Sequence, residues 1–203
     1  MTELDLKTTF KALYAVPRAP ALVEVPPMRF LMADGEGEPN TAPPYHETVK
    51  ALLALSYMIK FQIKKEGGID YFVMPIEGLW WADDMSRFTF EDKSNLKWTA
   101  LVMQPDVVTE EQVEAARAAT ARKWDLPALA RLRLDTFAEG PAAQCLHLGP
   151  YAEEGPAIRA LHDFIAAQGL RMRGKHHEIY LSDPRRTDPA MLRTIIRQPV
   201  EAA

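Results

Sequence analysis

The feature that most limits the fold of this sequence is a pattern of elements that occurs twice. Strand, glycine turn, helix, glycine, strand, polar loop, strand and Gln-Pro follow one another over about 28–105, and the same order returns over about 143–199. The two stretches share little identity beyond the Gln-Pro pairs at 104–105 and 198–199. This predicts an α+β fold of duplicated strand-helix-strand-strand units with pseudo-twofold symmetry. A central ligand groove is expected where the halves meet, because small-molecule pockets favour such seams.

Hydrophobic spacing and turn residues predict the elements of the first unit. A strand over 28–33 is expected to stop in a glycine turn at 34–37. A helix is expected over about 43–67, with proline at its start and apolar residues at helical spacing. Two further strands are expected at 69–74 and 96–103.

The second unit follows the same order. Residues 144–148 predict a strand, and 154–168 predict a helix with one apolar face and a glycine just after its end. The polar-rich strand at 176–184 comes next, and a strand at 192–197 is expected to end at Gln-Pro.

The remaining segments connect or precede the two units. Thr109 and Gln112 have the spacing of a capping box at the start of an alanine-rich helix. Residues 131–135 alternate with period two, which predicts a half-exposed strand, and residues 1–20 predict an extended arm. The expected organisation is a single domain over 1–203, with halves at about 22–105 and 131–199 and a connecting helix at about 109–123.

Composition restricts the classes of function. Apolar residues make up 47% of the 203, enough for a sizeable core. The net charge is −4, from 24 basic and 28 acidic residues without a basic block, so we expect no nucleic-acid partner. No apolar run is long enough for a membrane span, and the charged N-terminus is unlike a secretion signal. Cys145 is the only cysteine, which fits a reducing compartment. We therefore expect a cytoplasmic monomer or homodimer with a small-molecule partner.

Residues 176–184 read HHEIYLSDP and concentrate titratable groups in one strand. Alternate side chains of a strand share a face, so Glu178 and Tyr180 point one way, and His177 and Ile179 point the other. We take the apolar Ile179 as facing the helix. This orientation would place the carboxylate and the phenol together on the groove and divide the two histidines between the faces.

The adjacent histidines do not have the spacing of a zinc site. His176 and His177 diverge, and no Cys or His cluster supplies further ligands, so no metal is expected. We interpret them as an exposed residue beside a packed one.

Two interpretations of Glu178 are open, because a carboxylate within an apolar strand is costly to bury without a partner. It forms a salt bridge with Arg193 or Arg197 of a neighbouring strand, or it is functional. A functional Glu178 would be a buried anion for a cationic ligand, or a base whose pKa is raised by desolvation.

A second carboxylate, Glu77, precedes two adjacent tryptophans, Trp80 and Trp81. Both cannot lie on one face of an extended segment, so one is expected in the core while the other lines the groove. Tyr71 and Tyr151 would complete an aromatic box suited to planar or cationic ligands. The alternative is that both tryptophans are core residues and Tyr151 is a surface turn residue.

Five segments taken together resemble the GyrI-like small-molecule-binding family along nearly the whole chain. They are DLK and LY within 5–14, PMRFLMADGEG at 27–37, PIEGLWW at 75–81, HLGPY at 147–151 and HHEIYLSDP at 176–184. The resemblance implies the duplicated fold described above. The family includes drug-binding domains of multidrug-responsive transcription regulators, where a buried glutamate meets cationic aromatic drugs, and Glu178 matches the strand position of that glutamate. We expect no helix-turn-helix domain in this chain.

Within that family, the sequence looks most like stand-alone proteins that hydrolyse the cyclopropane ring of cyclopropanoid DNA-alkylating natural products. The resemblance implies xenobiotic binding with hydrolysis, in which Glu178 and Tyr180 are catalytic. The implied ligand-binding residues are Glu77, Trp80, Trp81, Tyr71 and Tyr151. No metal or organic cofactor is expected, because ring strain supplies the driving force. The alternatives are sequestration of lipophilic cations without turnover and a protein-interaction role like that of gyrase-inhibiting relatives.

Overall fold

The structure, a computed structural model, describes residues 2–37, 43–85 and 96–203. Two compact units interleave along the chain. Unit 1 comprises Met1–Thr9, Met28–Ile76 and Trp81–Phe137, and unit 2 comprises Phe10–Pro27, Glu77–Trp80 and Ala138–Ala203. The fold is α+β with mainly antiparallel strand pairing. The predicted pseudo-twofold axis and groove concern the arrangement of the halves and remain predictions.

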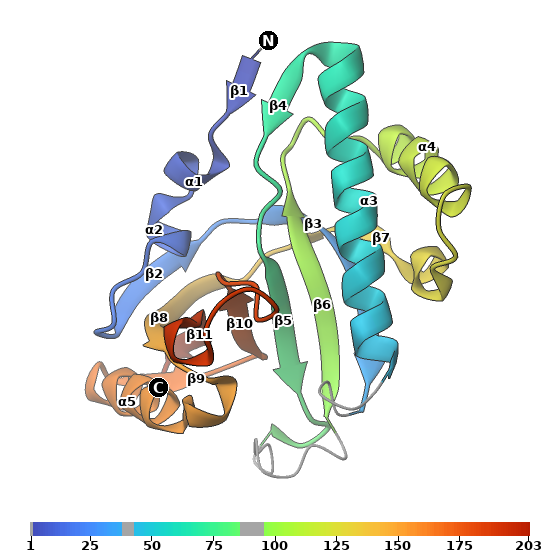
Figure 1. The fold of residues 1–203 in the computed structure, drawn as a ribbon. Coiled ribbons are helices and arrows are strands. Elements are labelled where there is room, and N and C mark those ends of the chain that lie inside the picture. The colour runs from blue at the N-terminus through green and yellow to red at the C-terminus, as the bar shows by residue number, and fades with distance from the viewer. Residues whose placement is uncertain (1, 38–42, 86–95) are drawn as a thin grey trace. The chain divides into compact units, whose positions relative to one another are not determined.

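Unit 1 is built on a central strand, β3, which pairs antiparallel with β6 and β7, while β1 pairs parallel with β4 (Figure 1). Its elements are β1 (Thr2–Leu4), α1 (Leu6–Thr9), β3 (Met28–Glu36), α3 (Pro43–Gly67), β4 (Ile69–Tyr71), β6 (Lys97–Gln104), α4 (Glu110–Ala121), the 3-10 turn η2 (Pro127–Arg131) and β7 (Arg133–Phe137). The strand predicted at 131–135 therefore belongs with the first half of the sequence, through β3.

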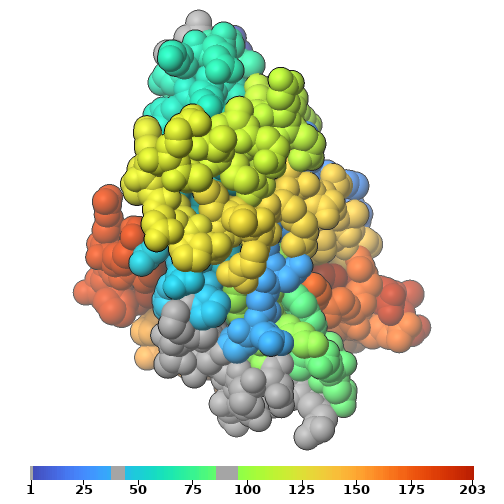
Figure 2. All heavy atoms as spheres, turned by 90° about the vertical axis from the view of Figure 1, so that its right-hand side faces the viewer, coloured from blue at the N-terminus to red at the C-terminus, as the bar shows by residue number. Residues whose placement is uncertain are grey.

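The long helix α3 confirms the helix predicted from the first unit. It buries Leu52, Leu55 and Ile59 along one stripe and packs on β3 and β6. Gly68, with φ 64°, ends it in the left-handed conformation that glycine adopts without strain. On its outer side α3 contacts α4 and η2, whose surface Figure 2 shows in green and yellow.

Unit 2 contains a sheet in the order β2-β8-β11-β10-β5, with β9 paired to the end of β11. Its elements are α2 (Lys11–Tyr14), β2 (Ala21–Val25), β8 (Gly140–Leu148), the 3-10 turn η3 (Tyr151–Glu153), α5 (Gly155–Ala167), β9 (Leu170–Met172), β10 (His176–Tyr180), the 3-10 turn η4 (Pro189–Met191) and β11 (Arg193–Ala202); β5 (Ile76–Trp81) contributes residues Glu77–Trp80. The helix α5 packs on β8, β9 and β11 and confirms the helix predicted at 154–168.

Several boundaries differ from those predicted. The predicted turn at 34–37 is strand as far as Glu36, because Gly35 leaves room for the Trp98 ring on β6. The strand predicted to end at Gln198-Pro199 continues to Ala202, since β9 provides a new partner there. The arm predicted at 1–20 contains α1 and α2. The capping box of Thr109 and Gln112 is confirmed.

None of the helices within the described ranges combines the length and the apolar character needed to cross a bilayer.

Candidate functional site

Strand β10 presents different chemistry on its two faces. Glu178 pairs with Ile196 of β11, and Ile196 pairs with Cys145 of β8. Directly paired residues of antiparallel strands point to the same side. The Cys145 Sγ lies 3.9 Å from the carbonyl oxygen of Ala157 in α5, so this is the face that α5 covers. Glu178 therefore lies on the helix-covered face, and the expectation that Ile179 faces the helix is wrong.

The reason is that the other face is covered too, by the segment that contains α2. Arg197 Nη2 donates to the carbonyl oxygen of Leu13 at 2.8 Å, and Gln144 Nε2 donates to that of Ala12 at 2.7 Å. Apolar side chains are consequently buried on both faces of the sheet. An apolar residue such as Ile179 could not identify the helix side from the sequence alone.

Glu178 is 6% exposed, and side chains of its own strand bind its carboxylate. Its Oε1 lies 3.2 Å from His176 Nε2, and its Oε2 accepts a 2.7 Å hydrogen bond from the Tyr180 hydroxyl. His176, Glu178 and Tyr180 occupy every second position of β10, so their side chains share a face. Each oxygen of the Glu178 carboxylate thus has a side-chain partner, one from the residue two positions before it and one from the residue two positions after it.

Tyr151 of η3 places a second ring beside this group. Its ring centroid lies 5.5 Å from that of Tyr180 at an interplanar angle of 73°, an edge-to-face contact. Burial, with the charges of Glu154 and Glu178, raises the pKa of Tyr151 to about 12, so its hydroxyl remains a neutral donor. Tyr151 is 37% exposed, which leaves part of the ring accessible. We call His176, Glu178, Tyr180 and Tyr151 the Glu178 site.

The opposite face carries a buried ionic network of five residues from five segments. His177 Nε2 lies 2.9 Å from Glu77 Oε2, and His177 Nδ1 lies 2.9 Å from Glu139 Oε1. Arg197 Nη1 donates to Glu139 at 3.2 Å, and the Tyr14 hydroxyl donates to Glu77 at 2.7 Å. All five side chains are buried. We call Tyr14, Glu77, Glu139, His177 and Arg197 the buried network.

The contacts of His177 fix its protonation. Both ring nitrogens face carboxylate oxygens, so donation on both sides requires an imidazolium. Burial alone would lower the pKa of His177, but the charge and hydrogen bond of Glu139, with those of Glu77, raise it to about 9. Burial likewise opposes ionisation of Glu139, yet His177 and Arg197 lower its pKa to about 2. Two cations therefore balance two anions within the network.

Glu77, predicted as a ligand-binding residue, lies in the buried network rather than beside Glu178. Because Glu77 contacts His177, alternation along β5 places Gly78 and Trp80 on the face of Glu178. The buried Trp80 indole lies against Gly78, where a Cβ would be 2.8 Å from its Nε1. Trp80 is therefore the tryptophan of unit 2 that shares a face with Glu178.

The other two predicted box residues belong to unit 1. Tyr71 is buried in β4, and Trp81 is half-buried at the end of β5. Their part in an aromatic box remains a prediction.

The two histidines are divided between the faces, as predicted, but both are buried: His176 is 2% and His177 0% exposed. The interpretation of an exposed residue beside a packed one is wrong, because each imidazole has a carboxylate partner. The alternative salt bridge from Arg197 to Glu178 is also wrong, since Arg197 binds Glu139 on the other face. Among the described residues, no group of three or more His, Cys, Asp or Glu is arranged to hold a metal ion.

Sequence reasoning missed Tyr14 and Glu139 as network members and His176 as the partner of Glu178. Tyr14 lies within the extended arm predicted over 1–20, and Glu139 lies outside every predicted strand and helix. One signal was available: Arg197 lies inside an apolar strand, and a buried guanidinium requires an acidic partner somewhere in the fold.

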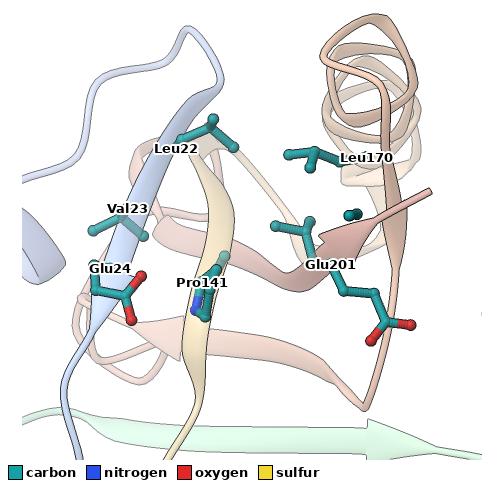
Figure 3. Close-up of a pocket in the computed structure, with 9 residues that line it drawn as sticks. Leu22, Val23, Glu24, Pro141, Leu170 and Glu201 are labelled. Carbon is teal, nitrogen blue, oxygen red and sulfur yellow. The ribbon is translucent and has the colours of Figure 1, made fainter.

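An open pocket of about 480 Å³ lies elsewhere in unit 2. Figure 3 shows Leu22, Val23 and Glu24 of β2, Pro141 of β8, Leu170 of β9 and Glu201 of β11 around it. None of the predicted site residues lines this pocket.

Comparison with known families identifies the domain. A sequence model of the GyrI-like small molecule binding domain matches residues 18–201. The chain belongs to the GyrI-like family. It therefore carries a GyrI-like small-molecule-binding domain.

Solved structures similar to this chain extend over nearly its whole length. An uncharacterized conserved protein from Listeria innocua is 39% identical, with a TM-score of 0.90, over 98% of this chain and 100% of that one. A hydrolase encoded by lin2189 from Listeria innocua is 38% identical, with a TM-score of 0.87 and the same coverage. The EcmrR C-terminal domain is 14% identical, with a TM-score of 0.56 over 91% of this chain and 98% of that one, and shares the fold. No curated protein matches the chain significantly.

Proposed function

We propose that this GyrI-like protein binds planar aromatic electrophiles at the Glu178 site and hydrolyses them by ring opening, with cyclopropanoid compounds as the substrate class. The observation that carries the proposal is Glu178, a residue only 6% exposed, whose carboxylate accepts a hydrogen bond from Tyr180, while the Tyr180 ring is in edge-to-face contact with Tyr151. The 38% identity to a Listeria innocua hydrolase over the full chain supports a hydrolytic reaction.

Binding would rest on aromatic contact. The edge-to-face arrangement of Tyr151 and Tyr180 forms a corner against which a planar ligand can stack. Trp80 lies on the same face as Glu178 and supplies a further indole at this side of the sheet.

The chemistry would begin with a water molecule held by Glu178. Each carboxylate oxygen accepts more than one hydrogen bond, so Oε2 can bind a water molecule while it accepts from Tyr180. The water oxygen forms a bond to a cyclopropane carbon as a ring C–C bond breaks, and Glu178 takes the water proton. The electron pair of the broken bond passes through the conjugated system to the carbonyl oxygen. That oxygen gains a proton and becomes a hydroxyl, while Glu178 returns its proton to solvent.

A neutral tyrosine hydroxyl would stabilise the charge that collects on the carbonyl oxygen. Tyr151 suits this role, because its pKa of about 12 keeps the proton available for donation. Tyr180 already donates to Glu178, so its main task would be to orient the carboxylate.

The test is incubation with a spirocyclopropyl cyclohexadienone, with mass spectrometry used to detect addition of one water. Glu178→Gln keeps the shape of the side chain but removes the base, so we expect turnover to fall about 10²- to 10⁴-fold. Glu24→Gln is the matched control, since it makes the same change on β2, at the open pocket away from the Glu178 site. Equal turnover by wild type and Glu178→Gln would refute the mechanism.

A second candidate is capture of lipophilic cations without turnover, which the same nearly buried carboxylate favours. In that case no water adduct would form with any substrate, and Glu178→Gln would weaken cationic ligands more than neutral ones of the same shape.

A further inference from the structure

Burying the charged side chains of the buried network costs free energy of desolvation. Removing charges from water costs several kcal/mol per ion by general estimates, and well-packed apolar residues often replace a buried ion pair without loss of stability. Four charged side chains of the network are nevertheless buried on one face of unit 2. The arrangement calls for a role that apolar packing could not fill.

One contact of the network joins two neighbouring strands of the sheet. His177 of β10 and Glu77 of β5 are 100 positions apart in the chain and lie 2.9 Å apart. Side chains alternate between faces with period two, so a slip of β5 by one residue would move each of its side chains to the other face. The contact of His177 with Glu77 is compatible with only one of these two arrangements.

Apolar patterning cannot choose between them. In β5, Leu79 and Trp80 lie on opposite faces, and both are buried. A slip by one residue would also put Trp81 in the place of Trp80. β5 therefore lacks the apolar-in, polar-out alternation that fixes register in a sheet with one buried face. The packing of the Trp80 ring over Gly78, where a Cβ would be 2.8 Å from Nε1, favours the observed register sterically, and the ion pair adds an electrostatic preference for the same register.

We propose that the His177–Glu77 ion pair is a register lock, which fixes β5 against β10 so that Trp80, and not Trp81, shares a face with Glu178 and Tyr180. A polar pair in an apolar setting selects one pairing because every other pairing leaves a buried charge without its partner. His177 and Glu77 are then positioning residues for the Glu178 site. The consequence for ligand binding rests on the proposed function, whereas the lock itself does not.

The rest of the network holds the lock in place. Glu139 binds the second ring nitrogen of His177, and Arg197 on β11 binds Glu139. Tyr14 binds Glu77 from the N-terminal segment. Both partners of the lock are thus fixed by groups outside β5 and β10.

The test removes the lock without leaving an unpaired charge. The triple variant Tyr14→Phe/Glu77→Leu/His177→Leu deletes one anion, one cation and the hydroxyl that would lose its acceptor, while Glu139 and Arg197 still pair. The matched control is Arg171→Gln/Glu201→Gln, which removes a cross-strand ion pair of 2.9 Å at the surface. Backbone NOEs between β5 and β10 report the register directly.

We expect the triple variant to remain folded but to show a second set of β5–β10 NOEs, whereas the control shows only the wild-type set. The affinity for acridine orange, a planar aromatic cation, should fall about tenfold in the triple variant as the Trp80 stacking is lost. A folded triple variant with wild-type NOEs and wild-type affinity would overturn the lock.

If the triple variant does not fold, a single substitution still tests the register lock. Glu77→Gln keeps the side-chain shape and an acceptor oxygen but removes the charge, so β5–β10 amide signals should become doubled. A single wild-type set in Glu77→Gln would overturn the lock. If wild type itself fails to bind acridine orange, the proposed function loses support while the NOEs still decide on the register.

Discussion

Glu139 and Arg197 form a buried ion pair at 3.2 Å, and both side chains are almost fully removed from solvent. Glu139 also accepts from His177, so a single carboxylate contacts both cations, and Glu77 on the other side of His177 supplies the second negative charge. The stability of unit 2 is therefore linked to the protonation of this group.

The first prediction concerns His177→Gln. Glutamine can satisfy one carboxylate with its amide but supplies no charge, which leaves the network with two anions and one cation. We expect a loss of about 3–5 kcal/mol in the free energy of unfolding, the range for breaking a buried pair on one side. Urea unfolding measures it, and His162→Gln, on the half-buried part of α5, is the control. A loss no larger than that of the control would contradict the ionic network.

The second prediction is a pH profile of stability. The pKa of His177 is raised to about 9 in the folded state, so its contribution is fully present below its ordinary value of 6.5 and is lost as pH rises through 9. The pKa of Glu139 is lowered to about 2, so its contribution is present above its ordinary value of 4.5 and is lost as pH falls toward 2. Stability from these groups should be greatest between those ordinary values, from pH 4.5 to 6.5.

Thermal unfolding across pH measures this profile. In His177→Gln the decline between pH 6.5 and 9 should flatten while the acid decline persists. An unchanged alkaline decline in that variant would assign it to another group.

Most helices and strands of the fold could be predicted from the sequence, but the contacts of the buried network could not. Helices such as α3 and α5 can be predicted from the spacing of their apolar residues and from the prolines and glycines at their ends, which are local signals. The network joins Tyr14, Glu77 and Glu139 to β10 from distant parts of the chain, and no local pattern pairs them. Glu178 could be singled out because a carboxylate stands among apolar neighbours, and the period of the strand placed Tyr180 on its face. His176 was missed as its partner because one of the two histidines was expected to be exposed.

The third prediction separates the two features of Tyr151 in the Glu178 site. Tyr151→Ala removes the ring that contacts Tyr180, so affinity for acridine orange should fall about two- to tenfold. Tyr151→Phe keeps the ring and should bind as wild type, but it should lower turnover of a spirocyclopropyl cyclohexadienone, because the donor to the carbonyl oxygen is gone. Isothermal titration and single-turnover kinetics measure the two effects. Weaker binding by Tyr151→Phe than by Tyr151→Ala would exclude the stacking role.

The fourth prediction concerns Tyr180→Phe, which removes the 2.7 Å hydrogen bond to Glu178 Oε2 and leaves the aromatic ring. Since that hydroxyl orients the carboxylate, the rate of ring opening should fall about tenfold, with binding of acridine orange nearly unchanged. Tyr57→Phe, a solvent-exposed tyrosine of α3, is the control. If Tyr180→Phe turned over substrate at the wild-type rate, Glu178 would not depend on Tyr180 for its orientation.

The fifth prediction tests why β3 continues where a turn was expected. At Gly35 an added Cβ would overlap the Trp98 ring, which is fully buried on β6 and has little room to move. Gly35→Ala should therefore destabilise the protein by about 1–3 kcal/mol through overpacking. At Gly67, the last residue of α3, a Cβ meets nothing within 4 Å, so Gly67→Ala should be neutral or stabilise by up to about 1 kcal/mol. If β3 and β6 pack through Gly35, urea unfolding should show a loss of stability in Gly35→Ala and none in Gly67→Ala. Equal effects of the two substitutions would mean that the Trp98 ring can move aside.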